Sequence, residues 1–386
     1  MIESSLFLNE CKKYGLTNFT GTPCSYLKPF INFVIEEPEL DFYAATNEGD
    51  AVALASGFWL AGKTSVVMFQ NSGLGNAVNP ITSLSYSSRI PFLGITTWRG
   101  EPGGKKDEPQ HELMGQITTD LLTLMKVAWE VFPTEASQIA PALKRAVEHM
   151  NTTRLPYFFV MKEGSVNKYE LSKDENTNEI YRSSQSVLYM CEGANQLTRT
   201  DALKIIRELS GPCTALLATT GKTGRELFEL GDTENQFYMV GSMGCASATG
   251  LGMALMQPKK DVVVIDGDGA LLMRLENLAL SGQYAPENMI HIVLDNNAHD
   301  STGGQRTDSN KIDFCQMANA CGYKNIIEVN DHQGFAKAYE IFKNAKGLTF
   351  VRFMIKMGSP EKLGRPTVTP DQVALRMKDF FTAEKN

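Results

Sequence analysis

Two short polar motifs in the second half of the chain carry residue types that bind metals and phosphates. Gly267-Asp268-Gly269 follows an apolar run at 261–266, and Asn296-Asn297 follows a second apolar run after 26 intervening residues. If both runs are parallel strands, the motifs lie at the carboxyl edge of one sheet, where ligands of such sheets bind. Asp268 offers a carboxylate oxygen and Asn297 an amide oxygen, and Mg²⁺ prefers oxygen ligands of this kind.

The glycines of the first motif suit a phosphate group beside that metal. Gly267 and Gly269 allow the backbone to approach closely, and a helix that opens near Ala270 would point unpaired N–H groups at an anion. The alternative is a plain tight turn followed by a plain strand end, since glycines mark turns in most proteins. Because both motifs are present, each after an apolar run, the sequence favours a magnesium diphosphate site.

Glu48 is the most informative residue of the first half. It follows a run at 41–46 and precedes a stretch of small residues that predicts a helix at 50–61. The helix dipole also favours an ordinary glutamate in a first turn, so Glu48 alone does not establish a catalytic role.

The segment at 98–111 gathers positive charge in Arg99, Lys105 and Lys106 and ends in His111. An anionic substrate could be neutralised there, and an imidazole whose pKa is near neutrality suits proton transfer. The alternative is a solvated turn with ordinary surface charges.

The segment at 219–223 ends in Gly-Lys-Thr, as a Walker A loop does, but Leu216 stands where that loop needs a further glycine. We therefore expect a strand-end loop near the diphosphate and no ATP site.

Together these motifs resemble the thiamine diphosphate (ThDP) enzymes, whose fingerprint is Gly-Asp-Gly followed by about two dozen residues and Asn-Asn. The resemblance implies that Asp268, Asn297 and the backbone carbonyl of His299 hold Mg²⁺, and that Glu48 hydrogen-bonds the aminopyrimidine ring. It also implies that the Gly241 carbonyl accepts a hydrogen bond from an aminopyrimidine nitrogen and that Met243 supports the bent cofactor. The alternative for Met243 is that it fills a gap in the core, as methionine often does. The implied cofactor-binding residues are Glu48, Ser72, Thr220, Gly221, Gly241, Met243, Gly267, Asp268, Gly269, Ala270, Asn297, Ser301 and Thr302.

Segments at 21–25, 71–76, 98–111, 301–305 and 363–368 are further similar to the phosphonopyruvate and sulfopyruvate decarboxylases. This resemblance implies non-oxidative decarboxylation of a small anionic 2-oxo acid, with phosphonopyruvate as the first choice, in phosphonate biosynthesis, and sulfopyruvate as the alternative. It implies a homodimer or larger homo-oligomer with active sites between chains. The implied catalytic residues are Glu48 and His111, and the implied substrate residues are Ser25, Asn71, Arg99, Lys105, Lys106 and His111.

Three other protein classes fit less well. A carboligase of the acetolactate synthase kind usually carries a middle domain, for which 386 residues leave no room. A non-catalytic ThDP-binding protein would not need Glu48. A Rossmann dehydrogenase would carry Gly-x-Gly-x-x-Gly after its first strand, and this chain does not.

The motifs require strands to position them, and the apolar runs supply these. Runs at 41–46, 64–70, 90–97 and 155–162 predict strands buried on both faces, with helices at 50–61 and 136–150. In the second half, runs at 214–218, 262–266, 290–295 and 348–355 predict strands, and 201–209 predicts a helix with Thr200 as its N-cap. We expect an α/β fold with two doubly wound parallel-sheet domains, a pyrimidine-binding domain at 1–165 and a diphosphate-binding domain at 199–386, joined by a polar linker at 166–198.

Composition narrows the class of protein. A chain with 42% hydrophobic and 21% charged residues suits two globular cores, and a net charge of −7 argues against a nucleic-acid surface. No apolar run approaches the roughly 18 residues of a membrane span. The seven scattered cysteines match no zinc or disulfide pattern, so the sequence predicts reduced thiols in a cytoplasmic protein.

Overall fold

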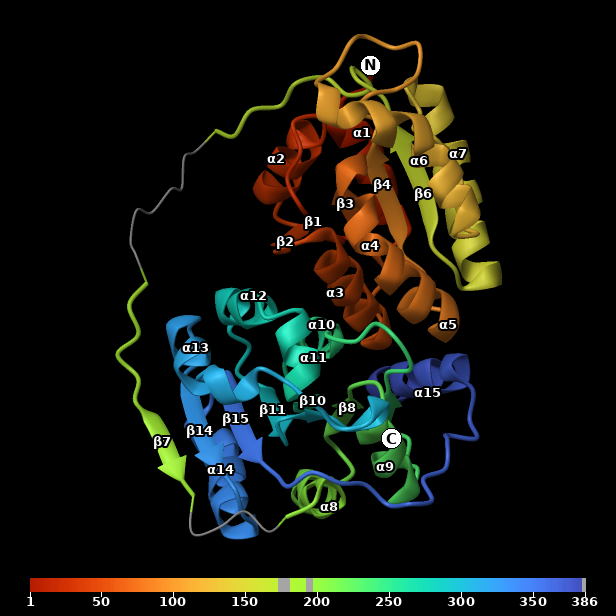
Figure 1. Ribbon diagram of the computed structural model, residues 1–386. Coiled ribbons are helices and arrows are strands. Elements are labelled where there is room, and N and C mark those ends of the chain that lie inside the picture. Colours follow the sequence, from red (N-terminus) through yellow and green to blue (C-terminus); the bar gives the residue numbers. More distant parts are fainter. Residues whose placement is uncertain (173–180, 192–196, 384–386) are drawn as a thin grey trace. The chain divides into compact units, whose positions relative to one another are not determined.

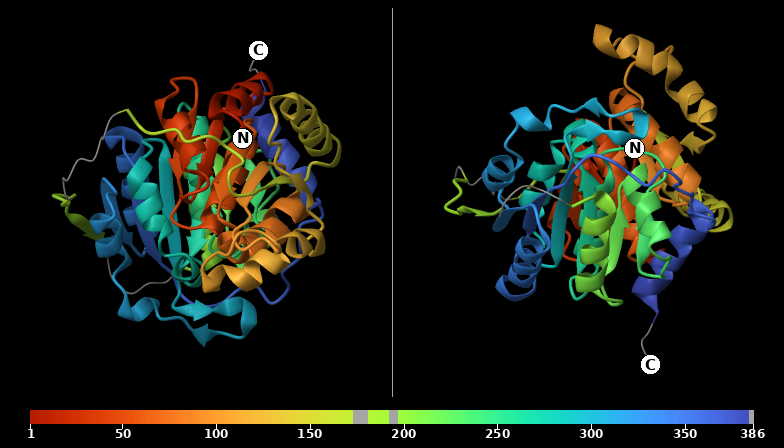
Figure 2. Two further views of the ribbon diagram at one scale, coloured as in Figure 1. Left: turned by 90° about the horizontal axis from the view of Figure 1, so that it is seen from above. Right: turned by 60° about the horizontal axis from the view of Figure 1, so that its bottom comes forward.

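The computed structural model (Figure 1) describes residues 1–172, 181–191 and 197–383. The chain forms two compact units, Met1–Asn178 and Glu179–Asn386. Each unit contains one large parallel sheet covered by helices, as the additional views in Figure 2 also show. The predicted α/β fold with two parallel sheets is therefore confirmed.

The first unit is built on six parallel strands in the order β2-β1-β3-β4-β6-β5. Its strands are β1 (Asn18–Gly21), β2 (Asp41–Ala44), β3 (Ser65–Phe69), β4 (Leu93–Thr97), β5 (Ala128–Val131) and β6 (Tyr157–Met161). Its helices are α1 (Ser4–Lys13), α2 (Lys28–Glu36), α3 (Glu48–Leu60), α4 (Leu74–Pro80), α5 (Tyr86–Ser88), α6 (Glu112–Leu124) and α7 (Ala136–Thr153), with short turns η1 (Asn71–Gly73), η2 (Ile81–Ser85) and η3 (Pro109–His111).

Alternate residues of β3 enter two separate cores. Val66 and Met68 join a core shared with α1, α2 and α7, whereas Val67 and Phe69 join a core shared with α3, α4 and α6. Successive side chains of a strand point to opposite faces, so helices must cover both faces of this sheet. This burial explains the nearly continuous apolar runs in the sequence.

The second unit contains seven parallel strands in the order β7-β14-β15-β11-β10-β8-β9 and a small antiparallel pair, β12-β13. Its strands are β7 (Val187–Met190), β8 (Ala215–Ala218), β9 (Gln236–Tyr238), β10 (Val262–Gly267), β11 (Met289–Asp295), β12 (Ala298–His299), β13 (Gln305–Arg306), β14 (Asn325–Val329) and β15 (Thr349–Met354). Its helices are α8 (Arg199–Ser210), α9 (Lys222–Glu229), α10 (Ala246–Met256), α11 (Asp268–Met273), α12 (Asn277–Tyr284), α13 (Phe314–Ala320), α14 (His332–Ala345) and α15 (Pro370–Thr382), with short turns η4 (Asp300–Thr302) and η5 (Ser309–Lys311).

Both sheets have a point at which the direction of winding reverses. In the first unit the chain runs outward from β1 to β2 and then returns to the other side of β1 as β3. In the second unit it runs outward from β8 to β9 and returns beyond β8 as β10. Ligands of open α/β sheets bind at the carboxyl ends of the strands on either side of such a reversal.

The structure differs from the sequence prediction at several elements. Strand β2 is partly exposed rather than buried on both faces, because it is the edge strand. The expected linker includes β7, which pairs with β14, while its parts at 173–180 and 192–196 lie outside the described residues. The N-cap of α8 is Thr198 and not Thr200, since Thr198 and Asp201 form a reciprocal capping box.

Candidate functional site

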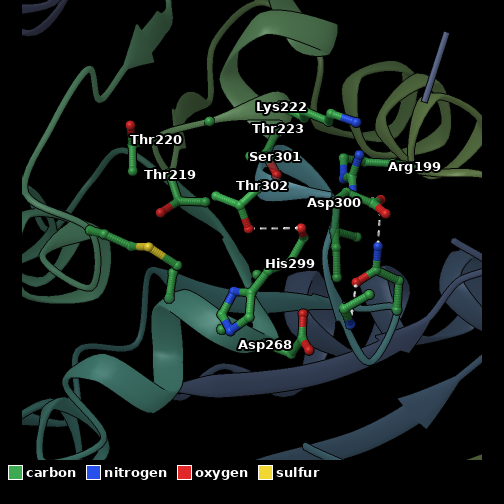
Figure 3. A pocket seen from close by; sticks show the side chains of 18 residues that line it. Arg199, Thr219, Thr220, Lys222, Thr223, Asp268, His299, Asp300, Ser301 and Thr302 are labelled. Atoms are coloured by element: carbon green, nitrogen blue, oxygen red, sulfur yellow. Dashed lines mark hydrogen bonds and ion pairs between the residues drawn. The ribbon is translucent and has the colours of Figure 1, made fainter. Parts of the chain in front are cut away.

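A pocket of about 280 Å³ lies at the reversal point of the second unit (Figure 3). It is lined by the loops that follow β8 and β10 and by the segment that follows β11. The pocket therefore occupies the position that the topology predicts for a ligand. Ten of the expected cofactor and metal residues line it: Thr220, Gly221, Met243, Gly267, Asp268, Gly269, Ala270, His299, Ser301 and Thr302.

Two glycines let backbone and side chains approach closely in this pocket. A Cβ atom on Gly269 would lie 2.6 Å from Cε1 of His299, which is closer than real Cβ contacts. Gly221 has φ of 93°, and a Cβ there would lie 3.0 Å from Ser301 Oγ. Side chains at either position would displace the neighbouring residues that line the pocket, His299 and Ser301.

Asp268 is the acidic residue of the pocket whose charge lacks a counterpart. Its side chain is buried, with 3% of the residue exposed, and it makes no ion pair in the ranges that the structure describes. Burial raises the pKa of the Asp268 carboxyl, against the opposing effect of the hydrogen bond from Thr307. A cation bound beside Asp268 would remove this electrostatic penalty.

The other two expected metal ligands add neutral oxygens. Asn297 has a left-handed φ of 57° and does not line the pocket. Its Oδ1 atom lies 3.0 Å from Ser309 Oγ. Ser309 Oγ in turn lies 3.0 Å from the Thr307 hydroxyl, which donates a hydrogen bond to Asp268. The His299 carbonyl accepts hydrogen bonds from Gly304 N at 3.0 Å and from Thr302 Oγ1 at 3.2 Å. No group of three or more His, Cys, Asp or Glu side chains could hold a metal in the described part of the chain. An oxygen set of one carboxylate, one amide and one carbonyl nevertheless fits Mg²⁺ and leaves positions for phosphate oxygens.

The sequence analysis did not single out the two cations of this pocket, Arg199 and Lys222. Arg199 is buried and already paired, with Glu226 Oε1 at 2.9 Å and Asp300 Oδ2 at 2.6 Å. Lys222 begins α9 and lines the pocket without an ion pair among the described residues. Its place in a Gly-Lys-Thr sequence after a strand was a usable signal once the ATP interpretation was excluded.

The segment after β9 places Gly241, Ser242 and Met243 near the same edge of the sheet. Ser242 has a left-handed φ of 51°, which turns the chain between its neighbours. Met243 lines the pocket and is partly exposed, so it is not core filler. Gly241 is outside the lining of the pocket.

Glu48 occupies the reversal point of the first unit. Its Oε1 atom accepts a hydrogen bond from Thr22 Oγ1 at 2.9 Å, and its Oε2 atom accepts one from Asn76 Nδ2 at 2.8 Å. Thr22 follows β1 and Asn76 lies in α4 after β3, so the carboxylate is held from both sides of the reversal. A Cβ on Gly73 would lie 2.1 Å from Glu48 Cδ, so only glycine leaves room for this conformation.

Helix α3 begins at Glu48 because Asn47 caps it. Asn47 Oδ1 accepts hydrogen bonds from Gly49 N at 2.8 Å and Asp50 N at 3.1 Å. Glu48 is therefore fixed in the first turn, where the helix dipole stabilises a carboxylate. Thr22, Gly73 and Asn76 lie in the segments 21–25 and 71–76 quoted for the resemblance, but their contacts with Glu48 could not be predicted because each lies far along the chain from it.

Arg99 is held by Asp107 rather than left free for a substrate. Arg99 Nε and Nη2 donate to the two oxygens of Asp107 at 2.6 and 2.5 Å, and the guanidinium lies over the Tyr26 ring. This bidentate pair keeps the pKa of Asp107 well below its usual range. The remaining nitrogen, Nη1, reaches Ser25 Oγ at 3.4 Å, so Arg99 and Ser25 do lie together.

The other expected substrate residues of this unit differ in their surroundings. The Asn71 amide makes three hydrogen bonds, since Oδ1 accepts from Arg99 N at 3.1 Å and Nδ2 donates to Arg99 O and Thr118 Oγ1, each at 2.9 Å. Lys105 and Lys106 are exposed, and Lys105 faces Glu163 at 3.6 Å. Ser72 is also exposed and accepts a hydrogen bond from Gln70 Nε2.

His111 is buried at the end of η3, with 7% of the residue exposed. Its Nδ1 atom has no hydrogen-bond partner within the described residues. A buried ring nitrogen without a partner is costly, and a bound ligand would supply the missing bond. The Gly100 backbone packs against the His111 carbonyl, where a Cβ would lie 2.2 Å away.

Comparisons with known proteins identify the family and the fold of this chain. The family model "Thiamine pyrophosphate enzyme, N-terminal TPP binding domain" matches residues 4–120, and "Thiamine pyrophosphate enzyme, C-terminal TPP binding domain" matches residues 221–353. Benzoylformate decarboxylase from Polynucleobacter necessarius has a similar fold, with a TM-score of 0.72 and 12% identity over 95% of this chain and all of that chain. No helix in the described ranges has both the length and the apolar character needed to cross a membrane.

Curated relatives match over nearly the whole chain. Phosphonopyruvate decarboxylase of Streptomyces viridochromogenes is 45% identical over 95% of this chain and 92% of its own length. Phosphonopyruvate decarboxylase of Streptomyces hygroscopicus is 41% identical over 99% and 94%. Sulfopyruvate decarboxylase of Methanosarcina acetivorans is 29% identical over 97% and 96%. The chain therefore belongs to the family of thiamine pyrophosphate enzymes that includes the phosphonopyruvate and sulfopyruvate decarboxylases.

Proposed function

We propose that this protein decarboxylates 3-phosphonopyruvate to phosphonoacetaldehyde and carbon dioxide, with thiamine diphosphate and Mg²⁺ as cofactors. The observation that carries the proposal is the 45% identity with a phosphonopyruvate decarboxylase over 95% of the chain. The geometry supports it independently, because each unit holds a polar site at the reversal point of its sheet. Sulfopyruvate is the second candidate substrate, since the sulfopyruvate relative is 29% identical over a similar length.

The second unit would bind the diphosphate end of the cofactor. Bound thiamine diphosphate supplies a carbon nucleophile for the keto group and takes up the electrons that carbon dioxide leaves behind. In the proposal Asp268, Asn297 and the His299 carbonyl hold Mg²⁺, while Lys222 and the N-terminus of α9 face the phosphates. Gly269 has no Cβ, which leaves room for the His299 ring beside the backbone of the pocket.

The first unit would supply the acid–base groups. Glu48 is positioned by Thr22 and Asn76 to accept or release a proton at the aminopyrimidine ring. His111 offers a buried Nδ1 that would hydrogen-bond the substrate or carry a proton. Arg99 would orient the substrate loop through Asp107, and its remaining N–H groups and the exposed lysines would attract the dianion.

An assembly of at least two chains is also part of the proposal. Glu48 belongs to one unit and Asp268 to the other, and the family resemblance implies that both residues serve one bound thiamine diphosphate. The family resemblance implies that the two units come from different chains, in a homodimer or larger homo-oligomer. A cytoplasmic location agrees with seven free cysteines, five of which are at most partly exposed.

The test is an assay of carbon dioxide release with phosphonopyruvate, sulfopyruvate and pyruvate. We expect the highest kcat/KM with phosphonopyruvate, phosphonoacetaldehyde as its product, and no release without added thiamine diphosphate and Mg²⁺. A higher kcat/KM with sulfopyruvate would make sulfopyruvate the substrate and leave the proposed cofactors unchanged. Release from phosphonopyruvate without either cofactor would refute the proposal.

A further inference from the structure

Two buried hydroxyl groups, those of Thr307 and Ser309, lie between the side chains proposed to bind the metal. Thr307 Oγ1 donates to Asp268 Oδ2, and Ser309 Oγ lies 3.0 Å from Asn297 Oδ1. The two hydroxyl oxygens are 3.0 Å apart, and Thr307 N also donates to the Asn297 carbonyl at 3.1 Å. One short segment after β13 therefore contacts both proposed metal ligands.

The number of protons in this network limits how it is bonded. Each hydroxyl has one proton, and the Thr307 proton points to the Asp268 carboxylate. Ser309 Oγ has three possible acceptors at 3.0 Å, namely the Thr307 hydroxyl, Asp295 Oδ1 and Asn297 Oδ1. Asp295 Oδ1 already accepts a hydrogen bond from Asn297 N at 3.1 Å. Asn297 Oδ1 has two lone pairs, so a hydrogen bond from Ser309 fixes the orientation of this amide and still leaves one lone pair for a cation.

The two acidic residues of this network differ in their compensation. Asp295 is buried and pairs with Arg352, whose Nε and Nη2 atoms lie 2.8 and 2.7 Å from Oδ2. Arg352 is held in turn by Glu328 at 3.2 Å. Asp268 has no such cation among the described residues. One carboxylate is therefore anchored to an arginine, whereas the charge of the other is not compensated by a cation among the described residues.

We propose that Thr307 and Ser309 are positioning residues that orient Asp268 and Asn297 for Mg²⁺. The inference rests on the proposed function, because it assumes that the pocket holds magnesium diphosphate. Hydrogen bonds from outside the ligand set fix the rotamers of metal ligands, and their removal typically lowers metal affinity by roughly 10- to 100-fold. Thr307 and Ser309 would set both the affinity for Mg²⁺ and the preference for it over larger ions.

The experiment is a calorimetric titration of each variant with MgCl₂ at a fixed concentration of thiamine diphosphate. Thr307→Val keeps the shape of the side chain and removes the hydroxyl, Ser309→Ala removes the second hydroxyl, and Thr307→Ser restores the first. The matched control is Thr214→Val, which removes a buried hydroxyl of the same unit that donates to Ser210 O at 2.7 Å. The thermal midpoint of each cofactor-free protein reports any general loss of stability.

We expect Mg²⁺ affinity to fall roughly 10- to 100-fold in Thr307→Val and Ser309→Ala, to recover in Thr307→Ser, and to stay unchanged in the control. The affinity for Ca²⁺ should fall less, because loosely held ligands accept the longer Ca²⁺–oxygen distances. A purely structural role would lower the thermal midpoint without changing the ratio of the two affinities.

Two outcomes separate this inference from the proposed function. If the wild-type protein binds no Mg²⁺ with thiamine diphosphate, the proposed cofactors are wrong. If the wild type binds both and the two hydroxyl-deleted variants match its Mg²⁺ affinity and its preference over Ca²⁺, the positioning role is refuted. Should Thr307→Val fail to fold, Ser309→Ala alone decides between these results.

Discussion

Gly73 packs against the carboxylate of Glu48, and Gly73→Ala tests whether the position of that carboxylate matters. The variant leaves Glu48 itself and every residue of the second unit unchanged. The added methyl group would occupy space that Glu48 now fills, since a Cβ would lie 2.1 Å from Cδ and 2.3 Å from both Cγ and Oε1. All three of these atoms belong to the flexible Glu48 side chain, so we expect this side chain to move and the backbone to keep its position.

The size of the effect follows from these distances. A Cβ atom in ordinary van der Waals contact lies at least 3.4 Å from its neighbour, whereas Glu48 Cδ would lie 2.1 Å from the added Cβ. The Glu48 carboxylate must therefore move by about 1.3 Å. That retreat breaks the hydrogen bonds from Thr22 and Asn76, which now measure 2.9 and 2.8 Å. A misplacement of about 1 Å at a reacting group costs on the order of 100-fold in rate. We expect proton removal from the thiazolium carbon of bound thiamine diphosphate to slow by at least that factor.

The assay is hydrogen–deuterium exchange at the thiazolium carbon in the holoenzyme, together with calorimetric affinity for thiamine diphosphate. Glu48→Gln is the reference for complete loss of the carboxylate. We expect exchange in this variant to be slower than in Gly73→Ala, while the cofactor still binds. Gly75→Ala is the matched control, since a Cβ two residues along the chain would have no neighbour within 4 Å. The control should exchange at the wild-type rate.

Wild-type exchange in Gly73→Ala would refute the reasoning, because the displaced carboxylate would then be dispensable. A loss of equal size in Gly75→Ala would also refute it, since the effect would come from helix α4 and not from Glu48. A lower thermal midpoint with unchanged exchange would show that Gly73 matters only for packing.

Three further predictions concern the metal, the phosphates and the substrate. Asp268→Ala should abolish Mg²⁺-dependent binding of thiamine diphosphate in calorimetry, and unchanged affinity would contradict the metal assignment. Lys222→Ala should lower the affinity for thiamine diphosphate by about 10- to 150-fold, which corresponds to one charge-assisted contact, but leave the affinity for thiamine unchanged. Equal losses of affinity for both compounds would contradict a contact between Lys222 and a phosphate. His111→Ala and Arg99→Ala should lower kcat/KM for phosphonopyruvate by about 10- to 150-fold at unchanged cofactor affinity. Asp107→Asn should reproduce the Arg99→Ala loss if Arg99 works by holding its loop, and near-normal kcat/KM in all three variants would assign the loop to the solvated surface.

The sequence predicted the central strands well because burial on both faces leaves a strong signal. The runs at 262–266 and 290–295 appear as β10 and β11 with their polar motifs at the carboxyl ends. The prediction omitted β1, β5 and β14, because a polar residue interrupts each of these short strands, namely Thr20, Glu130 and Glu328. Strand β7 was missed because its four apolar residues, Val187 to Met190, are short, at most half-buried and flanked by polar sequence.

Local motifs were also easier to predict than tertiary partners. Thr198 and Thr200 are equally good caps by residue type, and the choice depends on Asp201 completing the box at Thr198 while Thr200 bonds Glu226 instead. The hydroxyls of Thr22 and Thr307 had no distinguishing pattern, because their partners lie 26 and 39 residues away. The pairing of Arg99 with Asp107 likewise follows from the fold of the loop, which residue types alone do not determine.

The left-handed backbone of Asn297 limits which residues evolution or a protein engineer can place there. Its φ of 57° is strained for most side chains, and asparagine, aspartate and glycine tolerate it best. Glycine would relax the backbone but provide no oxygen for a metal, whereas aspartate would add a negative charge near Asp268 and Asp295. The metal preference of this pocket is therefore more readily redesigned through the residues that support position 297 than by substitution at position 297 itself.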